Sequence, residues 1–226
     1  MIKYVNGTVF NQNTDAKVNT VNTVGVMGAG IALEFSLRYP DMLFDYEEKC
    51  KNRLITVGKV DYYKTQGITI INFPTKWHFK YPSKIEWIEQ GLVDFVNTYK
   101  AAGITSVAFP RLGTSNGGLD WRDVQRVMEK YLSNLDIEVL ICLDNAPAEG
   151  LEKEMVDRFN DTDFSVKIPD VKLNVKQIAS LEQAKPIERF WKIKELEGVG
   201  ITCYKKLYEY FKKEKQRIAE QMTFDI

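Results

Sequence analysis

The stretch from Asn19 to Phe35 constrains the fold of this chain more than any other. It starts as a β-type run with two spaced asparagines, crosses a glycine turn and becomes a helical pattern that stops at Pro40. The glycines of the turn are Gly25, Gly28 and Gly30. Small residues between a strand and a helix let backbone amides approach a ligand, and a helix N-terminus favours anions. The stretch therefore predicts a site for a nucleotide or a sugar phosphate.

Strand-like and helical patterns alternate on both sides of this stretch, as in α/β proteins. The strand-like runs are Met1–Val5, Ala16–Val21, Val57–Tyr63, Ile68–Phe73, Ile104–Phe109 and Ile137–Leu143. The helical patterns cover Ile31–Tyr39, a segment opening at Pro40, a segment capped by Ser83 and ended by Gly103, and one starting near Asp120. Two of the strands form a hairpin, which predicts a mixed sheet with helices on both faces. We place this α/β domain at residues 1–150.

Residues 151–226 are richer in charge and show helical patterns near Val175–Gln183, Pro186–Leu196 and Tyr204–Gln221. They are expected to form a small helical C-terminal extension. The last pattern mixes lysine with apolar residues, which fits an amphipathic helix packed on the body of the protein. The alternative is a helix that contacts a partner or DNA through Lys205, Lys206, Lys212, Lys213 and Lys215.

Composition excludes several classes of function. Lys and Arg together number 31, and so do Asp and Glu, which argues against a broadly cationic nucleic-acid binder but leaves a local basic patch possible. Three distant cysteines and one histidine provide neither zinc-ligand spacing nor a disulfide framework, so we expect no metal and no cofactor. Because no apolar run approaches about 18 residues, we expect a cytoplasmic protein that does not enter the membrane.

A second glycine loop runs from Pro110 to Trp121, between a predicted strand and a predicted helix. Its glycines and small hydroxyl residues suit a backbone cradle for a diphosphate. It is not a P-loop, because it lacks the Gly-Lys-Ser/Thr ending, and its spacing does not match a dinucleotide-binding fingerprint. Either glycine loop by itself fits an ordinary turn equally well, but two in one α/β domain favour a binding site.

A third loop, Asn72–Lys80, follows a strand and contains Lys76. Most lysines are solvated surface charges, but Lys76 stands after Pro74 and among apolar residues, where partial burial would lower its pKa. A neutral lysine is a nucleophile for a sugar aldehyde or acetal carbon. His78 is a possible base or simply a packed side chain, and Trp77 and Phe79 either stack on a base or pack.

These three loops, in this order, resemble a macrodomain. The matching motifs are NTVNTVGVMGAGIA at 19–32, NFPTK at 72–76 and PRLGTSNGGLDW at 110–121. Within that family the sequence is most similar to the DarG-type antitoxins, relatives of the terminal ADP-ribose protein glycohydrolases, over about residues 1–145. The resemblance implies a three-layer α/β/α fold that binds ADP-ribose. It also implies removal of ADP-ribose from a thymidine-type base of DNA, which would counter a DarT-like toxin.

The resemblance also assigns roles to individual residues. Thr8 and Val9 would lie near the adenosine, and Asn22 and Thr75 beside the distal ribose. One wall of the ADP-ribose site would comprise Thr20, Val21, Gly28, Ala29, Gly30 and Ile31. The opposite wall would comprise Gly113, Thr114, Ser115, Asn116 and Gly117. Lys76 would be the catalytic nucleophile at the anomeric carbon, with Asp120 assisting proton transfer.

Two positions depart from the family pattern. Gly7-Thr8 stands where many macrodomains carry an aspartate that contacts adenine, and Ala29 replaces a longer, often basic residue. Two further functions stay open at the level of sequence. One is a module that binds ADP-ribose without hydrolysis, and the other is a hydrolase acting on ADP-ribosylated protein or on ADP-ribose phosphate.

Overall fold

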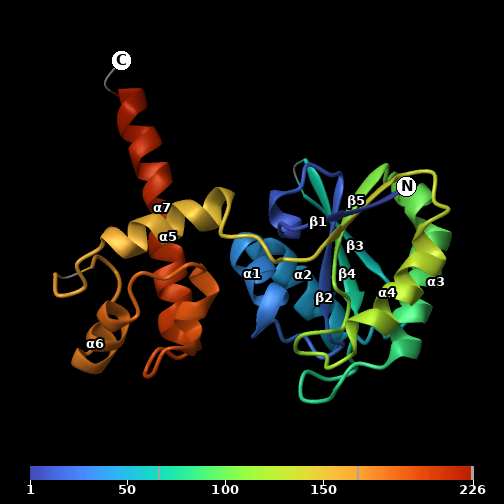
Figure 1. The fold of residues 1–226 in the computed structure, drawn as a ribbon, viewed down its shortest axis with the longest axis horizontal. Helices are drawn as coiled ribbons and strands as arrows, with labels where there is room; N and C mark the ends of the chain where they lie inside the picture. The colour runs from blue at the N-terminus through green and yellow to red at the C-terminus, as the bar shows by residue number, and fades with distance from the viewer. Residues whose placement is uncertain (66, 167, 225–226) are drawn as a thin grey trace. The chain divides into compact units, whose positions relative to one another are not determined.

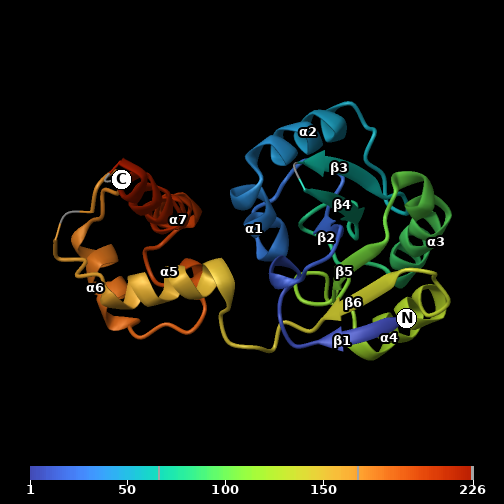
Figure 2. The same ribbon diagram turned by 90° about the horizontal axis from the view of Figure 1, so that it is seen from above.

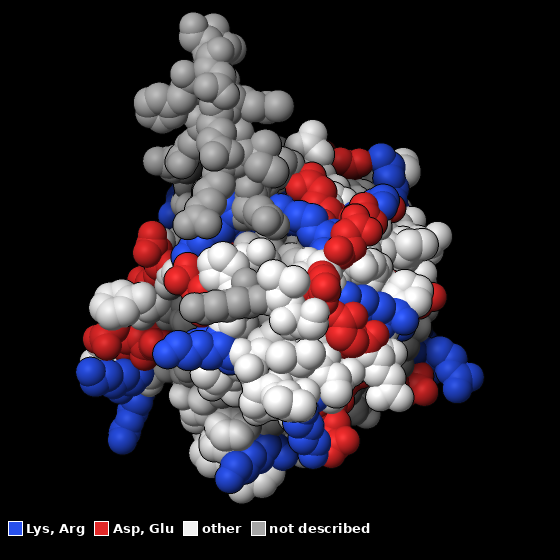
Figure 3. Space-filling model, turned by 90° about the vertical axis from the view of Figure 1, so that its left-hand side faces the viewer, with Lys and Arg blue, Asp and Glu red and all other residues white. Residues whose placement is uncertain are grey.

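The computed structural model describes residues 1–65, 67–166 and 168–224, without the side chains of 214–224. The chain forms two compact units, Met1–Asn145 and Ala146–Ile226 (Figure 1). No helix in the described part of the chain is long and apolar enough to cross a membrane. On the face drawn in Figure 3, basic and acidic side chains are interspersed.

The first unit is built on a six-stranded sheet with the order β1-β6-β5-β2-β4-β3 (Figures 1 and 2). The strands are β1 Ile2–Val5, β2 Ala16–Val21, β3 Asp61–Thr65, β4 Ile68–Pro74, β5 Ser106–Pro110 and β6 Glu138–Cys142. All neighbouring strands are parallel except β3, which pairs with β4 as an antiparallel hairpin. The prediction of a mixed sheet is therefore confirmed.

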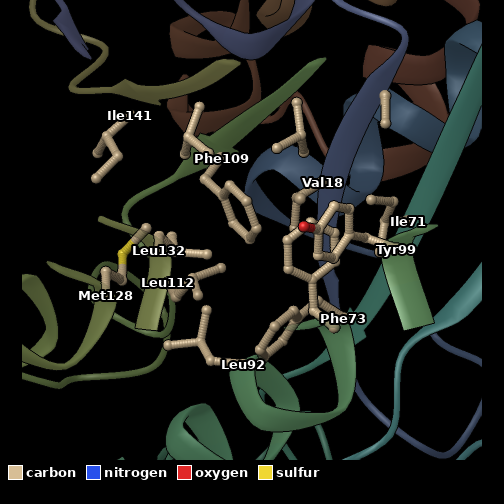
Figure 4. Close-up of a cluster of buried hydrophobic side chains, with 14 of the residues drawn as sticks. Val18, Ile71, Phe73, Leu92, Tyr99, Phe109, Leu112, Met128, Leu132 and Ile141 are labelled. Carbon is tan, nitrogen blue, oxygen red and sulfur yellow. The ribbon is translucent and has the colours of Figure 1, made fainter. Parts of the chain in front are cut away.

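Helices cover both faces of this sheet (Figure 2). After the short 3₁₀ helix η1, Val9–Asn11, come α1, Gly30–Arg38, and α2, Pro40–Lys51, which pack on one face. The helices α3, Ile85–Ala102, and α4, Trp121–Leu132, pack on the other face. Their core joins Leu92 and Met128 to Val18, Phe73 and Phe109 from the strands (Figure 4). These are the three layers expected from the sequence.

Most boundaries in this unit lie within two residues of the prediction, and two differences have a structural explanation. The strand expected at Val57–Tyr63 begins only at Asp61, after a turn around Gly58 with a φ of 78°. The helix expected to be capped by Ser83 has Lys84 as its N-cap residue, without a side-chain cap. Ser83 instead donates its backbone N–H to the carbonyl oxygen of Gly117 at 2.9 Å. A long-range backbone contact thus fixes Ser83, and its side chain does not cap α3.

The second unit contains α5, Gly150–Asp161, α6, Val175–Gln183, the 3₁₀ helix η2, Phe190–Glu195, and α7, Ile201–Phe224. Its core is an aromatic cluster with ring centroids 4.9 to 6.4 Å apart, formed by Phe159, Phe164, Phe190 and Phe211. A buried ion pair joins Arg189 to Glu152, with Nε–Oε1 at 3.0 Å. The expected helical extension is therefore present.

The helix predicted at Pro186–Leu196 is wrong, because only the η2 turn forms there. Ile187 donates its backbone N–H to Asn160 Oδ1 at 2.9 Å, and Phe190 donates to Glu152 Oε1 at 3.0 Å. Both acceptors belong to α5, which was not predicted. The Phe190 amide, which a continuous α-helix would have directed to the Pro186 carbonyl, thus bonds to a side chain of α5.

The helix α7 is amphipathic, as its sequence pattern indicates. It buries Tyr204, Leu207, Tyr208 and Phe211 within the second unit. Lys205, Lys206 and Lys213 are exposed and Lys212 is half-buried, while the side chain of Lys215 lies outside the described residues. A contact of these lysines with a partner or DNA remains a prediction.

Candidate functional site

The three loops singled out in the sequence follow β2, β4 and β5, which are adjacent parallel strands. The carboxyl ends of parallel strands lie at one edge of the sheet, where open α/β sheets bind ligands. Thr8 and Val9 follow β1 at the same edge; the side chain of Val9 is buried, and the Thr8 carbonyl accepts from Gln12 Nε2 at 2.9 Å. The fold therefore gathers the predicted segments at this edge.

The loop after β2 is held by Asn22. Its Oδ1 accepts from the amides of Val24 at 2.9 Å and Val26 at 3.3 Å, and its Nδ2 donates to the Val26 carbonyl at 2.6 Å. The buried Tyr46 hydroxyl, from α2, donates to the Asn22 carbonyl at 2.7 Å. Asn22 thus shapes this loop, and its predicted contact with a distal ribose stays a prediction.

The N-terminus of α1 opens directly behind this loop. Its N-cap residue, Ala29, supplies no side-chain hydrogen bond, and the first turn contains no acidic residue. Gly28, Ala29 and Gly30 are exposed, whereas Ile31 is half-buried. The first amides of the helix are therefore available to an anion, and the helix dipole adds to that preference.

The loop after β5 is a tight turn that only glycine permits at position 117. A Cβ atom at Gly117 would lie 2.0 Å from the Gly113 carbonyl oxygen, and Gly113 itself has a φ of 65°. Gly118 donates to the Thr114 carbonyl at 2.6 Å, and Leu119 to the Gly113 carbonyl at 3.1 Å. This folding leaves Ser115 and Asn116 exposed at the tip of the loop.

Asn116 brings the two glycine loops together. Its Nδ2 lies so near Gly30 that a Cβ atom there would approach it to 2.8 Å. Gly30 also has a φ of 55°, in the region that favours glycine. The two predicted walls of the site therefore meet at Gly30 and Asn116, although they are far apart in sequence.

Lys76 lies at the same junction. Its Nζ donates a hydrogen bond to the backbone carbonyl oxygen of Asn116, and partial burial lowers the pKa of its ammonium group. The preceding Thr75 is buried and donates its amide to the Val21 carbonyl at 2.9 Å. Thr20, the residue before Val21 in β2, is half-buried. The loop that carries Lys76 is thus fixed to the end of β2. Partial burial makes the amine of Lys76 easier to convert to its neutral, nucleophilic form.

Asp120 has a separate local role, because it caps α4. Its Oδ1 accepts from the Arg122 amide at 2.8 Å, and about half of its side chain is exposed. Among the described residues no hydrogen bond joins Asp120 to Lys76. Its predicted part in proton transfer remains a prediction.

Two positions that shape the site were not found from the sequence. Tyr46 bonds to Asn22, but in the sequence it is only one apolar position of a helix. Ser83 buries its hydroxyl beside Gly117, where a Cβ would lie 2.6 Å from its Oγ. Tyr46 had no sequence signal, and Ser83 was predicted only as a helix cap, since both act on the site through long-range contacts. Within the described residues, no group of three or more His, Cys, Asp or Glu is placed to hold a metal ion.

Comparison with known proteins places this geometry in a family. The family described as Macro domain matches residues 18–128. The solved macrodomain of Mycobacterium tuberculosis DarG is 46% identical, with a TM-score of 0.60, and the match covers 63% of this chain and 97% of that one. The chain belongs to the macrodomain family. The prediction made from the three motifs is therefore confirmed.

Two further similarities concern longer proteins. The DNA ADP-ribosyl glycohydrolase of Mycobacterium tuberculosis is 43% identical over 157 residues, which are 67% of this macrodomain chain and 45% of that protein. Thermosipho africanus DarTG, solved in complex with ADP-ribose, is 36% identical with a TM-score of 0.61 and matches 63% of this chain and 41% of that one. The chain thus spans less than half the length of these relatives.

Proposed function

We propose that this chain is an ADP-ribosyl glycohydrolase that removes ADP-ribose from a thymidine-type base of DNA. The observation that carries the proposal is the position of Lys76, a partly buried amine where the three loops predicted to bind the ligand meet. The names of the relatives add support, because one is a DNA ADP-ribosyl glycohydrolase and another was solved with ADP-ribose.

In this proposal the glycine loops bind the diphosphate. The open amides at the N-terminus of α1 and the backbone of Gly113 to Gly117 donate to its oxygens. The adenosine lies toward Thr8 and Val9, and the distal ribose lies toward Asn22 and Thr75. That arrangement puts the anomeric carbon of the distal ribose beside Lys76.

The proposed reaction uses the neutral form of Lys76. Its Nζ attacks the anomeric carbon of the distal ribose, a nitrogen–carbon bond forms, and the bond from that carbon to the base breaks. Asp120 assists transfer of the displaced proton from the lysine nitrogen to the leaving base. Water then attacks the same carbon, the lysine leaves as an amine, and ADP-ribose is released.

The modified DNA is proposed to be the product of a DarT-like toxin, which makes this chain the antitoxin activity of such a pair. We also place it in the cytoplasm, where the DNA substrate is found. The thiols of Cys50, Cys142 and Cys203 are free, which fits a reducing compartment.

The test compares Lys76→Ala with wild type on a thymidine-modified oligonucleotide, a guanosine-modified oligonucleotide and a modified protein. Lys76→Ala is expected to stop release of ADP-ribose from the thymidine substrate while still binding ADP-ribose in calorimetry. Lys100→Ala, which removes an exposed lysine of α3, is the matched control and is expected to keep full activity.

Full activity of Lys76→Ala would show that Lys76 is not the nucleophile of the reaction. ADP-ribose binding by the wild type without turnover of any substrate would instead identify a binding module. Turnover of the modified protein alone would change the substrate class.

A further inference from the structure

The residues directly after Lys76 form an exposed aromatic surface, here called the aromatic loop and defined as Trp77 to Tyr81. The exposed fractions are 57% for Trp77, 44% for Phe79 and 54% for Tyr81. Large aromatic side chains usually bury most of their area, so three exposed rings in five consecutive residues need a reason. None of these rings belongs to either core cluster of the first unit.

The rings face one another in an ordered arrangement. Trp77 and Tyr81 are nearly parallel, with an interplanar angle of 10° and centroids 6.1 Å apart. His78 stacks on Phe79 with centroids 4.3 Å apart. The aromatic rings of this loop therefore form an ordered cluster and are not isolated surface side chains.

The backbone of the aromatic loop is fixed to the candidate site. The Trp77 carbonyl accepts from the hydroxyl of Thr23 at 2.6 Å and from its amide at 3.3 Å. Tyr81 donates its amide to the His78 carbonyl at 3.1 Å, which closes a turn. Since Trp77 is also the next residue after Lys76, the rings begin within one residue of the proposed nucleophile.

The charged side chains carried by this segment of the chain have one sign. From Pro74 to Ile85 the chain carries Lys76, Lys80 and Lys84 and no Asp or Glu. Lys80 and Lys84 are both exposed. Exposed aromatic faces interleaved with lysines are the combination with which proteins bind single-stranded nucleic acid, where bases stack on rings and cations contact phosphates.

We infer that the aromatic loop binds the single-stranded DNA that flanks the modified base, and this inference rests on the proposed glycohydrolase function. A base attached to the distal ribose at Lys76 places its neighbouring nucleotides over Trp77 and Tyr81. Bases of an intact duplex are already stacked on one another, so the loop favours unpaired strands. The occupant is thus a nucleotide segment, with Lys80 and Lys84 contacting its phosphates.

The test measures kcat/KM for two substrates, an ADP-ribosylated single-stranded oligonucleotide and thymidine-linked ADP-ribose without flanking nucleotides. Trp77→Ala is expected to lower kcat/KM for the oligonucleotide by roughly 5- to 150-fold more than for the short substrate, the range typical of losing one base–ring stack. Tyr81→Ala gives an independent second variant. Phe44→Ala, which removes a 69% exposed ring from α2, is the matched control and is expected to change neither value.

Equal losses on both substrates would overturn the inference, because the ring would then act at the ribose. The same holds if neither Trp77→Ala nor Tyr81→Ala discriminates between the substrates.

Binding of an unmodified single-stranded oligonucleotide, followed by fluorescence anisotropy, separates this inference from the proposed function. Weaker binding by Trp77→Ala supports the aromatic loop even if the wild type hydrolyses neither substrate, a result that would refute only the glycohydrolase. If Trp77→Ala binds the oligonucleotide as well as the wild type does, and the wild type hydrolyses its substrates, only the proposed DNA contact of the aromatic loop is refuted.

Discussion

The Nζ atom of Lys76 donates a hydrogen bond to the backbone carbonyl oxygen of Asn116, 40 residues further along the chain. The same Asn116 places its side-chain amide against Gly30. One residue at the tip of the loop after β5 therefore contacts both the proposed nucleophile and the glycine turn that opens α1. The contact aims the amine at the edge of the sheet, where the ligand is proposed to bind.

The first prediction concerns pH. Burial lowers the pKa of Lys76 below its usual value of 10.5, and only the neutral amine is a nucleophile. The single-turnover rate is therefore expected to rise with pH, by at most about tenfold per pH unit. It should reach its plateau below pH 10.5, because the pKa of Lys76 is lowered. Stopped assays at a series of pH values measure this profile. A rate that falls as pH rises would contradict a lysine nucleophile.

The second prediction separates the two possible roles of Asp120. Asparagine caps helices about as well as aspartate, so Asp120→Asn is expected to keep the free energy of unfolding, whereas Asp120→Ala should lose roughly 1 kcal/mol. If the carboxylate assists proton transfer, both variants should lower kcat by about 100-fold. Urea denaturation and single-turnover kinetics measure the two effects. A normal kcat in Asp120→Asn would mean that Asp120 acts only as the N-cap residue of α4.

The third prediction concerns the loop that Asn22 shapes. Tyr46→Phe removes the hydroxyl that donates to the Asn22 carbonyl at 2.7 Å, and it is expected to cost roughly 1–2 kcal/mol of unfolding free energy. Affinity for ADP-ribose should fall several-fold, because the loop loses its support. Tyr62→Phe is the matched control: its hydroxyl lies 2.8 Å from Thr98 Oγ1, so it should lose stability without losing affinity. Equal affinities in the two variants would mean that Tyr46 supports the fold only.

Local patterns in the sequence were sufficient for most elements of the first unit. The run from Ala16 to Val21 and the glycine turn after it predicted β2 and α1, because strand and helix periodicities are local properties. The predictions failed where distant residues compete for backbone groups. The Phe190 amide bonds to Glu152 of α5 and does not continue an α-helix. Ser83 bonds to Gly117, and Lys84 takes the N-cap position of α3.

By itself, the sequence determined the α/β class, the helical extension and, through three motifs in order, membership of the macrodomain family. It also singled out Lys76 and the two glycine loops. Only the tertiary structure decided that Lys76, Asn116 and Gly30 meet, that Asn22 shapes its own loop with the help of Tyr46, and that the aromatic loop is exposed. The physical reason is that these contacts depend on the parallel pairing of β2 with β4 and β5, which joins segments that are distant in the chain.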